Sequence, residues 1–342
     1  MNIIYSSSDS YIKYTSISIC SLFENNRELE IINVTILSTD IKEDSARILH
    51  KLSKKYNRQI RILDVSKQIR EYLKDCNLPP FRGGFEVYST LFLSRLFPEL
   101  DRAIYIDADT LVLGSLKSLW EKSLEENVIG AVPDYGNYGL YSSSEDKSLL
   151  NQDGHYYNSG FLIYDFNNWR SQKIDNLIDT NIRLESLNFL IFDQSIINCF
   201  LKGKILTLPM KFNLTTSLHG ISFKTFKKVF QLKDIEFDSA YFYENTRNVI
   251  VVHFVGQYFE RPWINNGYSP YKDIYLNYSK LAGFKNIITS ASPNAIFPFN
   301  VADKVSILLR RFNFYNVYAR FRYHYSQLIY RFIKIFIPNL KR

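Results

Sequence analysis

The chain has 342 residues, of which 46% are hydrophobic and 22% are charged, and its three cysteines are too few and too widely spaced for a disulfide framework or a zinc pattern. The formal net charge of +8 is unevenly placed, because residues 304–342 hold nine of the 42 Lys and Arg residues and no Asp or Glu. The remainder, with 33 basic and 34 acidic residues, is nearly neutral, so the overall basicity says little about what the main domain binds. We expect a reducing compartment, with no signal peptide at Met1–Tyr5 and no membrane-spanning apolar run.

Short apolar runs alternate with segments of helical spacing in the first half of the chain. Strands are predicted at Ile3–Tyr5, Val34–Leu37, Ile60–Leu63 and Ala103–Ile106, and helices at Tyr14–Phe23 and Glu43–Tyr56. This alternation predicts an α/β fold whose mostly parallel sheet is covered by helices. The sequence contains neither Gly-x-Gly-x-x-Gly after the first strand nor a Walker-type Gly-Lys-Ser/Thr, which argues against dinucleotide oxidoreductases and P-loop enzymes.

Two aspartates separated by one small residue follow the fourth predicted strand. In extended chain, Asp107 and Asp109 point to the same face, at the strand end where open α/β sheets bind ligands. Paired carboxylates suit a hard divalent cation, and such a cation suits a diphosphate. Taken alone, however, Asp-x-Asp is short and common, and a surface turn explains it better than a metal site does.

The second half of the chain adds further predicted elements and a long polar loop. Leu111–Trp120 leads into a helix, Val128–Val132 and Phe161–Tyr164 are predicted strands, and Ser195–Leu201 is a predicted helix. The polar stretch Tyr135–Gly154 is predicted to be a loop, and loops of this length are often functional. Ser290–Asn294 is predicted to be a hinge before the basic tail.

Four short motifs then stand in order: Asp107-Ala108-Asp109, Asn158-Ser159-Gly160, Asp193-Gln194, and His253-Phe-Val-Gly256 with Arg261-Pro-Trp behind it. Their order and spacing resemble glycosyltransferase family 8, the retaining sugar transferases of the GT-A fold, over roughly the first three quarters of the chain. The resemblance implies a GT-A, Rossmann-like catalytic domain at residues 1–290, with a mixed, mostly parallel sheet.

The resemblance also implies a role for each motif. Asp107, Asp109 and His253 would hold Mn²⁺, with Mg²⁺ as the alternative, and the cation would stabilise the leaving diphosphate of a UDP-sugar. From position alone, His253 could equally be a core histidine bonded to backbone. Asp193 and Gln194 would lie beside the anomeric carbon, although Asp193 could instead cap the following helix.

Other residues are expected to contact the donor. By resemblance, Asp134, Asn158 and Ser159 belong to the sugar region, and Gly160 lets the backbone come close to the sugar. The loop after the first strand resembles a uridine-binding loop, although a polar loop that only caps the next helix would look the same. The remaining expected contacts come from Ser6, Ser7, Ser8, Asp9, Tyr11, Ala108, Gly256 and Arg261.

The chain departs from the family at two positions. Arg261 precedes Pro262-Trp263 where the family usually has lysine, and an arginine can still bind a phosphate. The family also has a basic residue upstream of the aspartate pair, at a position that falls near Leu91 here. Arg95 is the nearest basic residue, and we expect it either to take over this donor contact or to leave it unmade.

Residues 291–342 interleave Arg and Lys with Phe, Tyr, Ile and Leu, as in Arg320-Phe-Arg-Tyr323. Such a segment suits an anionic membrane surface, to which each basic residue contributes about 1 kcal/mol. Nucleic-acid binding and a packed helix pair are alternatives for the same composition. We expect the membrane, with residues 304–342 in contact with it, and no nucleic acid.

The sequence as a whole therefore predicts a retaining, Mn²⁺-dependent hexosyltransferase. It would move glucose or galactose from a UDP-sugar to a saccharide or glycolipid acceptor in lipopolysaccharide or capsule synthesis, on the inner face of the cell membrane. Two alternatives stay open, a non-catalytic relative that binds UDP-sugars and a basic protein that binds membrane or nucleic acid. Oligomeric state is not indicated.

Overall fold

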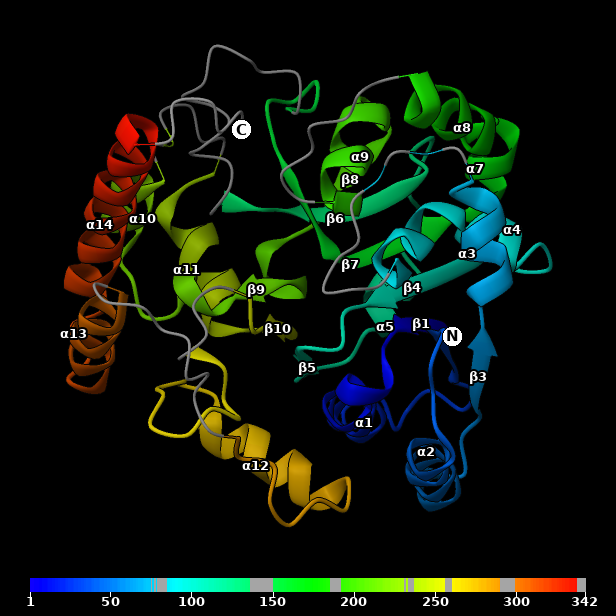
Figure 1. The fold of residues 1–342 in the computed structure, drawn as a ribbon, viewed down its shortest axis with the longest axis horizontal. Helices are drawn as coiled ribbons and strands as arrows, with labels where there is room; N and C mark the ends of the chain where they lie inside the picture. The colour runs from blue at the N-terminus through cyan, green and yellow to red at the C-terminus, as the bar shows by residue number, and fades with distance from the viewer. Residues whose placement is uncertain are drawn as a thin grey trace.

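The computed structural model describes residues 1–74, 76, 78, 85–135, 150–184, 192–230, 232, 237–255, 260–289 and 299–336. These residues form a seven-stranded sheet between two layers of helices, a second sheet of three strands, and a pair of C-terminal helices along one side (Figure 1).

The large sheet has the strand order β3-β2-β1-β4-β7-β6-β8. Its strands are β1 (Asn2–Ser6), β2 (Asn33–Ser38), β3 (Ile60–Asp64), β4 (Arg102–Ile106), β6 (Ile129–Pro133), β7 (Tyr157–Asp165) and β8 (Ile205–Thr207). Neighbouring strands run parallel except around β7, which is antiparallel to both β4 and β6. The expected mixed, mostly parallel sheet is therefore confirmed, and every strand predicted from the sequence overlaps an observed strand.

Side chains that alternate along each strand divide the core into two layers. Ile3 and Tyr5 on β1 face one layer, which packs under α1 (Ile12–Glu24) and α2 (Glu43–Tyr56). Ile4 faces the other layer, which packs under the remaining helices of the large sheet. These are α3 (Ser66–Tyr72), η2 (Glu86–Phe92), α4 (Leu93–Leu96), α7 (Phe166–Ser171), α8 (Ile174–Leu184) and α9 (Phe192–Phe200).

A three-stranded sheet lies beside the carboxyl ends of β1 and β4. Its order is β5-β10-β9, formed by β5 (Thr110–Val112), β10 (Val251–His253) and β9 (Leu214–Thr215). The other short elements are η1 (Asp9–Tyr11), α5 (Lys117–Trp120), η3 (Met210–Phe212), η4 (Thr216–Leu218), α10 (Phe223–Val229), α11 (Ser239–Arg247) and α12 (Lys272–Leu281). Because β5 follows β4 directly, this small sheet fixes the chain just after Asp109.

The basic C-terminal segment forms α13 (Phe299–Arg311) and α14 (Tyr315–Phe336), which pack on each other, and α14 also packs on α10 (Figure 1). Ala319 joins the apolar cluster that contains Phe226, and Tyr315 fills the space against Gly220, where a Cβ atom would lie 2.4 Å from the ring. The packed helix pair, one of the alternatives for this segment, is therefore observed within the described residues. The predicted hinge at Ser290–Asn294 falls outside them.

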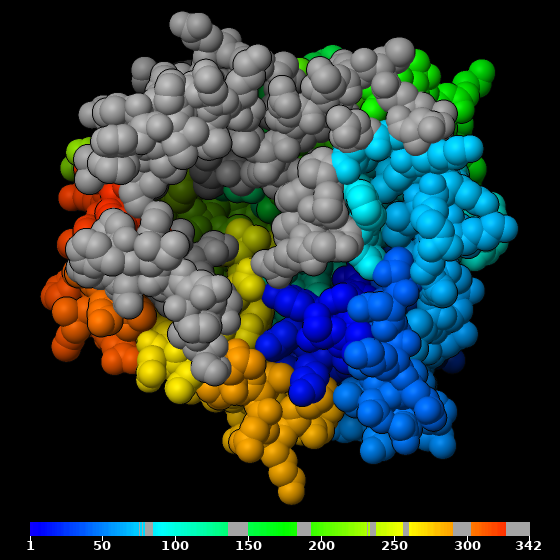
Figure 2. Space-filling view, viewed as in Figure 1, coloured from blue at the N-terminus to red at the C-terminus, as the bar shows by residue number. Residues whose placement is uncertain are grey.

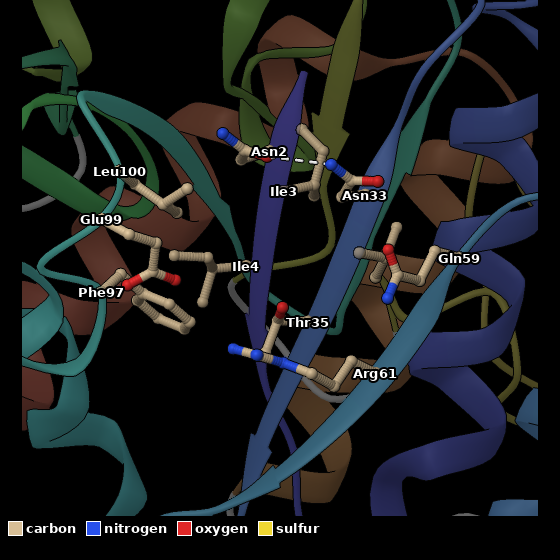
Figure 3. Close-up of a pocket in the computed structure, with 11 residues that line it drawn as sticks. Asn2, Ile3, Ile4, Asn33, Thr35, Gln59, Arg61, Phe97, Glu99 and Leu100 are labelled. Atoms are coloured by element: carbon tan, nitrogen blue, oxygen red, sulfur yellow. Dashed lines mark hydrogen bonds between the residues drawn. The ribbon is translucent and has the colours of Figure 1, made fainter.

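A groove on the large sheet lies away from the predicted site residues. It crosses the starts of β1 and β2, where Asn33 donates to Asn2, and Phe97 and Glu99 border it (Figure 3). Its volume of about 140 Å³ is small for a nucleotide sugar, and none of its lining residues is a predicted site residue. None of the helices in the described ranges is long and apolar enough to cross a membrane.

Candidate metal and donor site

The two aspartates of the Asp-x-Asp motif lie where the two sheets meet. Asp107 follows the last residue of β4, and its backbone N–H donates to the carbonyl of Gly160 on β7 at 2.8 Å. In the small sheet, β10 pairs antiparallel with β5 so that His253 lies opposite Thr110. The N–H of Phe254 also donates to the carbonyl of Asp109 at 2.9 Å. This register places His253 next to both aspartates, although 144 residues separate it from Asp109.

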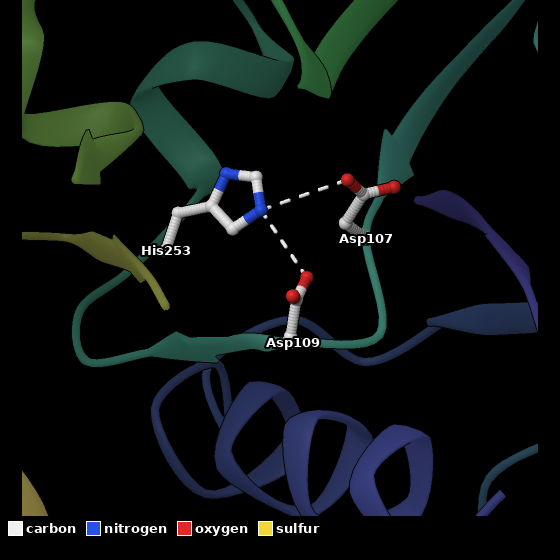
Figure 4. A group of neighbouring side chains, drawn as sticks. All are labelled: Asp107, Asp109 and His253. Atoms are coloured by element: carbon white, nitrogen blue, oxygen red, sulfur yellow. Dashed lines mark hydrogen bonds and ion pairs between the residues drawn. The ribbon is translucent and has the colours of Figure 1, made fainter. Parts of the chain in front are cut away.

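One nitrogen of the His253 ring faces both carboxylates (Figure 4). The Nε2 atom lies 3.2 Å from an oxygen of Asp109 and 3.6 Å from an oxygen of Asp107. One ligand atom from each of the three residues lies within 4.8 Å of the other two, a spacing that a single metal ion can bridge. Two carboxylates and one imidazole form a ligand set that suits Mn²⁺ as well as Mg²⁺, with the imidazole favouring Mn²⁺.

The hydrogen bond made by the second nitrogen of His253 determines which ring nitrogen carries a proton. Its Nδ1 atom lies 3.1 Å from the side-chain oxygen of Asn213, whose own amide nitrogen donates to Asn158 at 2.7 Å. Since Asn213 thus presents its oxygen to His253, Nδ1 carries a proton, and Nε2 is the nitrogen that would bind a metal ion. His253 is 1% exposed and contacts side chains through both nitrogens, so it is not a core histidine bonded to backbone.

Gly160 supports this arrangement in a way that the sequence did not indicate. A Cβ atom at Gly160 would lie 2.2 Å from Cε1 of His253 and 2.7 Å from an oxygen of Asp107. The sequence predicted that this glycine allows an approach to the sugar, but in the structure its open side is occupied by His253 and Asp107. The glycine is therefore needed for the histidine to reach the aspartates.

A network of buried amide and carboxyl groups extends from Asn213 to the predicted sugar region. The Asn158 amide donates to Gln194 at 3.1 Å and to Asp134 at 3.3 Å, and Gln194 donates to the same Asp134 oxygen at 3.1 Å. The N–H of Ser159 donates to Gln194 at 3.2 Å. The structure thus brings Asp134, Asn158, Ser159 and Gln194 together, although they come from three separate elements.

Asp193 lies in the first turn of α9, so it does not stand before the helix as a cap would. Its carboxylate accepts from the Thr90 hydroxyl at 2.9 Å, and Thr90 itself comes from η2. Burial and the nearby charge of Asp107 raise the pKa of Asp193 to about 7. Burial and the charge of Asp109 likewise raise the pKa of Asp107, although His253 and Tyr105 oppose this shift. Burial and neighbouring carboxylates therefore both disfavour the ionised form of these two groups.

Arg261 lies on the other side of the aspartates, in the segment after β10. Its guanidinium donates to the Tyr11 hydroxyl at 3.0 Å and lies 3.9 Å from an oxygen of Asp109. Trp263 packs against this guanidinium at 5.8 Å and against Tyr14 at 4.5 Å between ring centres. Figure 2 shows the surface hollowed near the middle of the view, beside yellow atoms from the region of β10. A bound anion next to Arg261 and Asp109 would be held by a cation and by a metal ion together.

The serine-rich loop after β1 is mainly occupied by internal contacts. Ser6 donates to the Glu86 carbonyl, Ser7 bonds Thr15 at 2.7 Å, and Ser8 bonds Ser10 at 3.0 Å. Asp9 accepts from the N–H of Lys42 at 2.9 Å and so joins this loop to the start of α2. These contacts match the alternative of a polar loop that caps and supports its neighbours, and any contact with uridine stays a prediction.

One predicted donor contact, that of Arg95, is not supported by its position. Arg95 is directed away, because its guanidinium is bound to Asp179 at 2.6 Å and to Asp175 at 3.5 Å on α8 and lies over the Tyr72 ring. This bidentate pairing occupies the guanidinium, which favours the second of the two expected alternatives, that Arg95 leaves the donor contact unmade. Thr90 is instead the η2 residue that reaches Asp193. Ala108 lies between the aspartates and is 9% exposed, whereas Gly256 falls outside the described residues.

Comparison with known proteins finds a matching family profile and several similar sequences. The sequence profile described as "Glycosyl transferase family 8" matches residues 2–267. General stress protein A of Bacillus subtilis is 26% identical over 292 residues, which cover 84% of this chain and 96% of that protein. A lipopolysaccharide 1,2-glucosyltransferase of Escherichia coli is 25% identical over 310 residues, which cover 89% of this chain and 82% of that protein.

Solved structures agree on the fold. A galactosyltransferase, LgtC, whose crystal structure is described as a complex with donor and acceptor sugar analogues, superposes with a TM-score of 0.66. The match covers 86% of this chain and 99% of that chain at 21% identity. The α/β architecture is therefore the GT-A fold of that structure.

Gly160→Ala should weaken divalent-cation binding, because the added methyl group displaces His253 from the aspartates. We expect a loss of about 10- to 100-fold in Mn²⁺ affinity, the range found when the surroundings of a metal ligand change. Isothermal titration calorimetry with Mn²⁺ measures this affinity. Gly114→Ala is the matched control, since a Cβ there meets Ile250 at an ordinary 3.4 Å. Equal affinities in the two variants would contradict the role given to Gly160.

Asn213→Leu should also weaken Mn²⁺ binding, by about 10- to 100-fold, because the proton on Nδ1 of His253 loses its acceptor. Asn213→Asp keeps an acceptor and should bind Mn²⁺ at least about tenfold more tightly than the leucine variant. Asn245→Leu is a control for the loss of a buried amide, since the side chain of Asn245 bonds backbone groups of Lys211 and Tyr241, away from His253. If the Asp and Leu variants bind Mn²⁺ equally, Asn213 does not set the histidine proton.

Proposed function

This chain belongs to glycosyl transferase family 8, and on that basis we propose that it transfers a hexose, glucose or galactose, from a UDP-sugar to a saccharide acceptor with retention of configuration. The observation that carries the proposal is the convergence of Asp107, Asp109 and His253 at one point, with Arg261 beside them. This combination of carboxylates, imidazole and guanidinium is suited to a metal-bound diphosphate, which every nucleotide sugar contains.

In this proposal, Asp107, Asp109 and the Nε2 atom of His253 hold Mn²⁺. The cation supplies a Lewis acid that stabilises charge on the departing UDP. Arg261 binds the diphosphate from the side of Tyr11, so that the leaving group meets positive charge on two sides. Burial and the charge of Asp107 raise the pKa of Asp193, and a bound cation would offset the contribution of Asp107 and so favour the ionised carboxylate.

The hexose is assigned to the region around Asp134, Asn158, Asp193 and Gln194. All four side chains are buried; Asp134, Asn158 and Gln194 are bonded to one another and Asp193 to Thr90, so their positions are fixed before the sugar arrives. Asp193 and Gln194 can hydrogen-bond sugar hydroxyls and stabilise positive charge at the anomeric carbon. Retention then follows either from attack on the face that UDP leaves or from a double displacement, and both are compatible with these groups.

The acceptor is proposed to be a growing cell-surface glycan, such as lipopolysaccharide or capsule, on a lipid carrier. The similarity to an enzyme named as a lipopolysaccharide glucosyltransferase supports this choice. We assign catalysis to residues 1–290 and membrane attachment to residues within 304–342, on the cytoplasmic side of the membrane.

The α13–α14 pair offers a surface of suitable chemistry for that attachment. Leu308, Phe312, Phe314 and Val317 are each more than half exposed around the turn between the helices. The basic residues Lys304, Arg311 and Arg320 are exposed on the same helices. Aromatic and aliphatic side chains flanked by cations are typical of segments that lie on anionic lipid.

The enzymatic proposal predicts release of UDP from a UDP-hexose in the presence of Mn²⁺. In a panel of UDP-sugars, UDP-glucose or UDP-galactose should be hydrolysed most rapidly even without an acceptor. Asp107→Asn should lower the rate by about 100-fold or more, since a metal ion contributes several kcal/mol to such a transition state. Asp64→Asn, at the end of β3, is the matched control and should leave the rate unchanged.

No UDP release from any donor, with UDP and Mn²⁺ still bound, would favour the alternative of a non-catalytic relative that binds nucleotide sugars. Failure to bind UDP with Mn²⁺ at all would contradict the proposed function.

The membrane proposal predicts that Phe312→Ser with Phe314→Ser removes sedimentation with vesicles that contain anionic lipid. Each exposed aromatic ring contributes buried apolar area on the membrane, about 1.5–3 kcal/mol at most. Ile31→Ser is the matched control, because Ile31 is 63% exposed on the body and should not affect sedimentation. Binding that survives the double substitution, or that does not depend on anionic lipid, would contradict the proposal.

A further inference from the structure

The C-terminal helix α13 carries a charged side chain into the interior of the protein. Arg310 is 0% exposed, and among the residues that the structure describes it is the one arginine or lysine that is buried. A cation in the interior requires a partner of opposite charge and further hydrogen bonds, because burial removes its water. Arg310 therefore belongs to the interior of the protein, although it lies in the basic C-terminal segment.

The partner of Arg310 is the carboxylate of Glu260, which is 2% exposed. The two groups are 2.5 Å apart, and the Tyr318 hydroxyl on α14 donates to the same oxygen of Glu260. Arg310 also donates to the Thr216 carbonyl at 3.1 Å, and its guanidinium lies 4.8 Å from the centre of the Tyr318 ring. Both helices of the C-terminal pair thus hold one carboxylate.

Glu260 is joined directly to the donor site, because the next residue is Arg261. While Glu260 is held on the side of α13, the guanidinium of Arg261 reaches the Tyr11 hydroxyl and the Asp109 carboxylate on the opposite side. The peptide between them is followed by Pro262, whose ring restricts the backbone further. Displacement of Glu260 would therefore shift the position of Arg261.

The same cluster also reaches the strand that carries His253. Thr216 follows β9, which pairs with β10. Its hydroxyl lies 3.3 Å from the carbonyl of Val255 and 3.4 Å from the second oxygen of Glu260. Thr216 thus contacts both Val255, which follows the strand of His253, and Glu260, which precedes Arg261. Arg310 is bonded to both Thr216 and Glu260.

We propose that the α13–α14 pair is a structural part of the donor site, in which Arg310 and Glu260 are positioning residues that hold Arg261 against the diphosphate. This inference rests on the proposed function. In this proposal the C-terminal helices have two faces. The inner face, with Arg310 and Tyr318, is buried and shapes the donor site. The outer face, with Leu308 and Phe312, is exposed and free for other contacts.

The test replaces the ion pair by an uncharged pair of similar size, Arg310→Met with Glu260→Gln, so that neither charge is left buried alone. The Kd for UDP in the presence of saturating Mn²⁺ is measured by titration calorimetry. We expect it to rise about tenfold, the effect of weakening one charge-assisted hydrogen bond to phosphate. Binding of Mn²⁺ alone should change less than about twofold, because its three ligands are not displaced. Tyr318→Phe, a milder change that removes a single donor to Glu260, should raise the Kd about two- to threefold.

Arg322→Met is the matched control on the same helix pair. Arg322 is bonded to Asp303 at 3.1 Å within the pair. Its loss should therefore leave the Kd for UDP unchanged.

Arg261→Ala separates positioning from general stability. If Arg310 and Glu260 act through Arg261, their replacement should have no further effect on the Kd for UDP once Arg261 has been removed. An equal tenfold effect in the Arg261→Ala background would overturn the proposal, and so would a Kd for UDP that stays within twofold of wild type in the folded double variant. If the wild-type protein itself does not bind UDP with Mn²⁺, the proposed function fails and this inference fails with it.

Discussion

The pairing of β10 with β5 is the interaction on which the rest of the site depends. Antiparallel register sets His253 opposite Thr110, and only this register puts the imidazole beside the carboxylate of Asp109. A shift by one residue would turn the histidine to the other face of the strand. Gly160 then provides the space, and Asn213 provides the acceptor that holds the proton on Nδ1.

This geometry brings several carboxyl groups close together. Asp107, Asp109, Asp134 and Asp193 converge in one region with few compensating cations among the described residues, and the pKa of Asp193 is raised to about 7 by burial and by the charge of Asp107. A divalent cation would relieve this repulsion, and Arg261 adds a positive charge next to Asp109. The proposed donor site therefore depends on long-range contacts: the register of the small sheet and the C-terminal helices that hold Glu260.

Local sequence patterns were sufficient to predict six of the seven strands of the large sheet and the helices α1, α2 and α9 beside them. What could not be predicted lies in contacts between distant segments. Thr90 reaches Asp193 across 103 residues, and nothing in its own neighbourhood in the sequence marks it. Arg95 was expected at the donor because its charge is visible in the sequence, whereas its pairing with Asp179 depends on how α8 packs. Arg310 was counted with a basic tail, although it is buried.

The central claim is that one metal ion is held by two aspartates and a histidine from the two sheets. Anomalous scattering at a wavelength that distinguishes manganese, from crystals grown with Mn²⁺ and UDP, tests it most directly. The account predicts a single strong peak within bonding distance of Asp107, Asp109 and Nε2 of His253, with the Nδ1 atom still facing Asn213. Absence of a peak at a site where UDP is bound, or a peak that His253 does not contact, would contradict it.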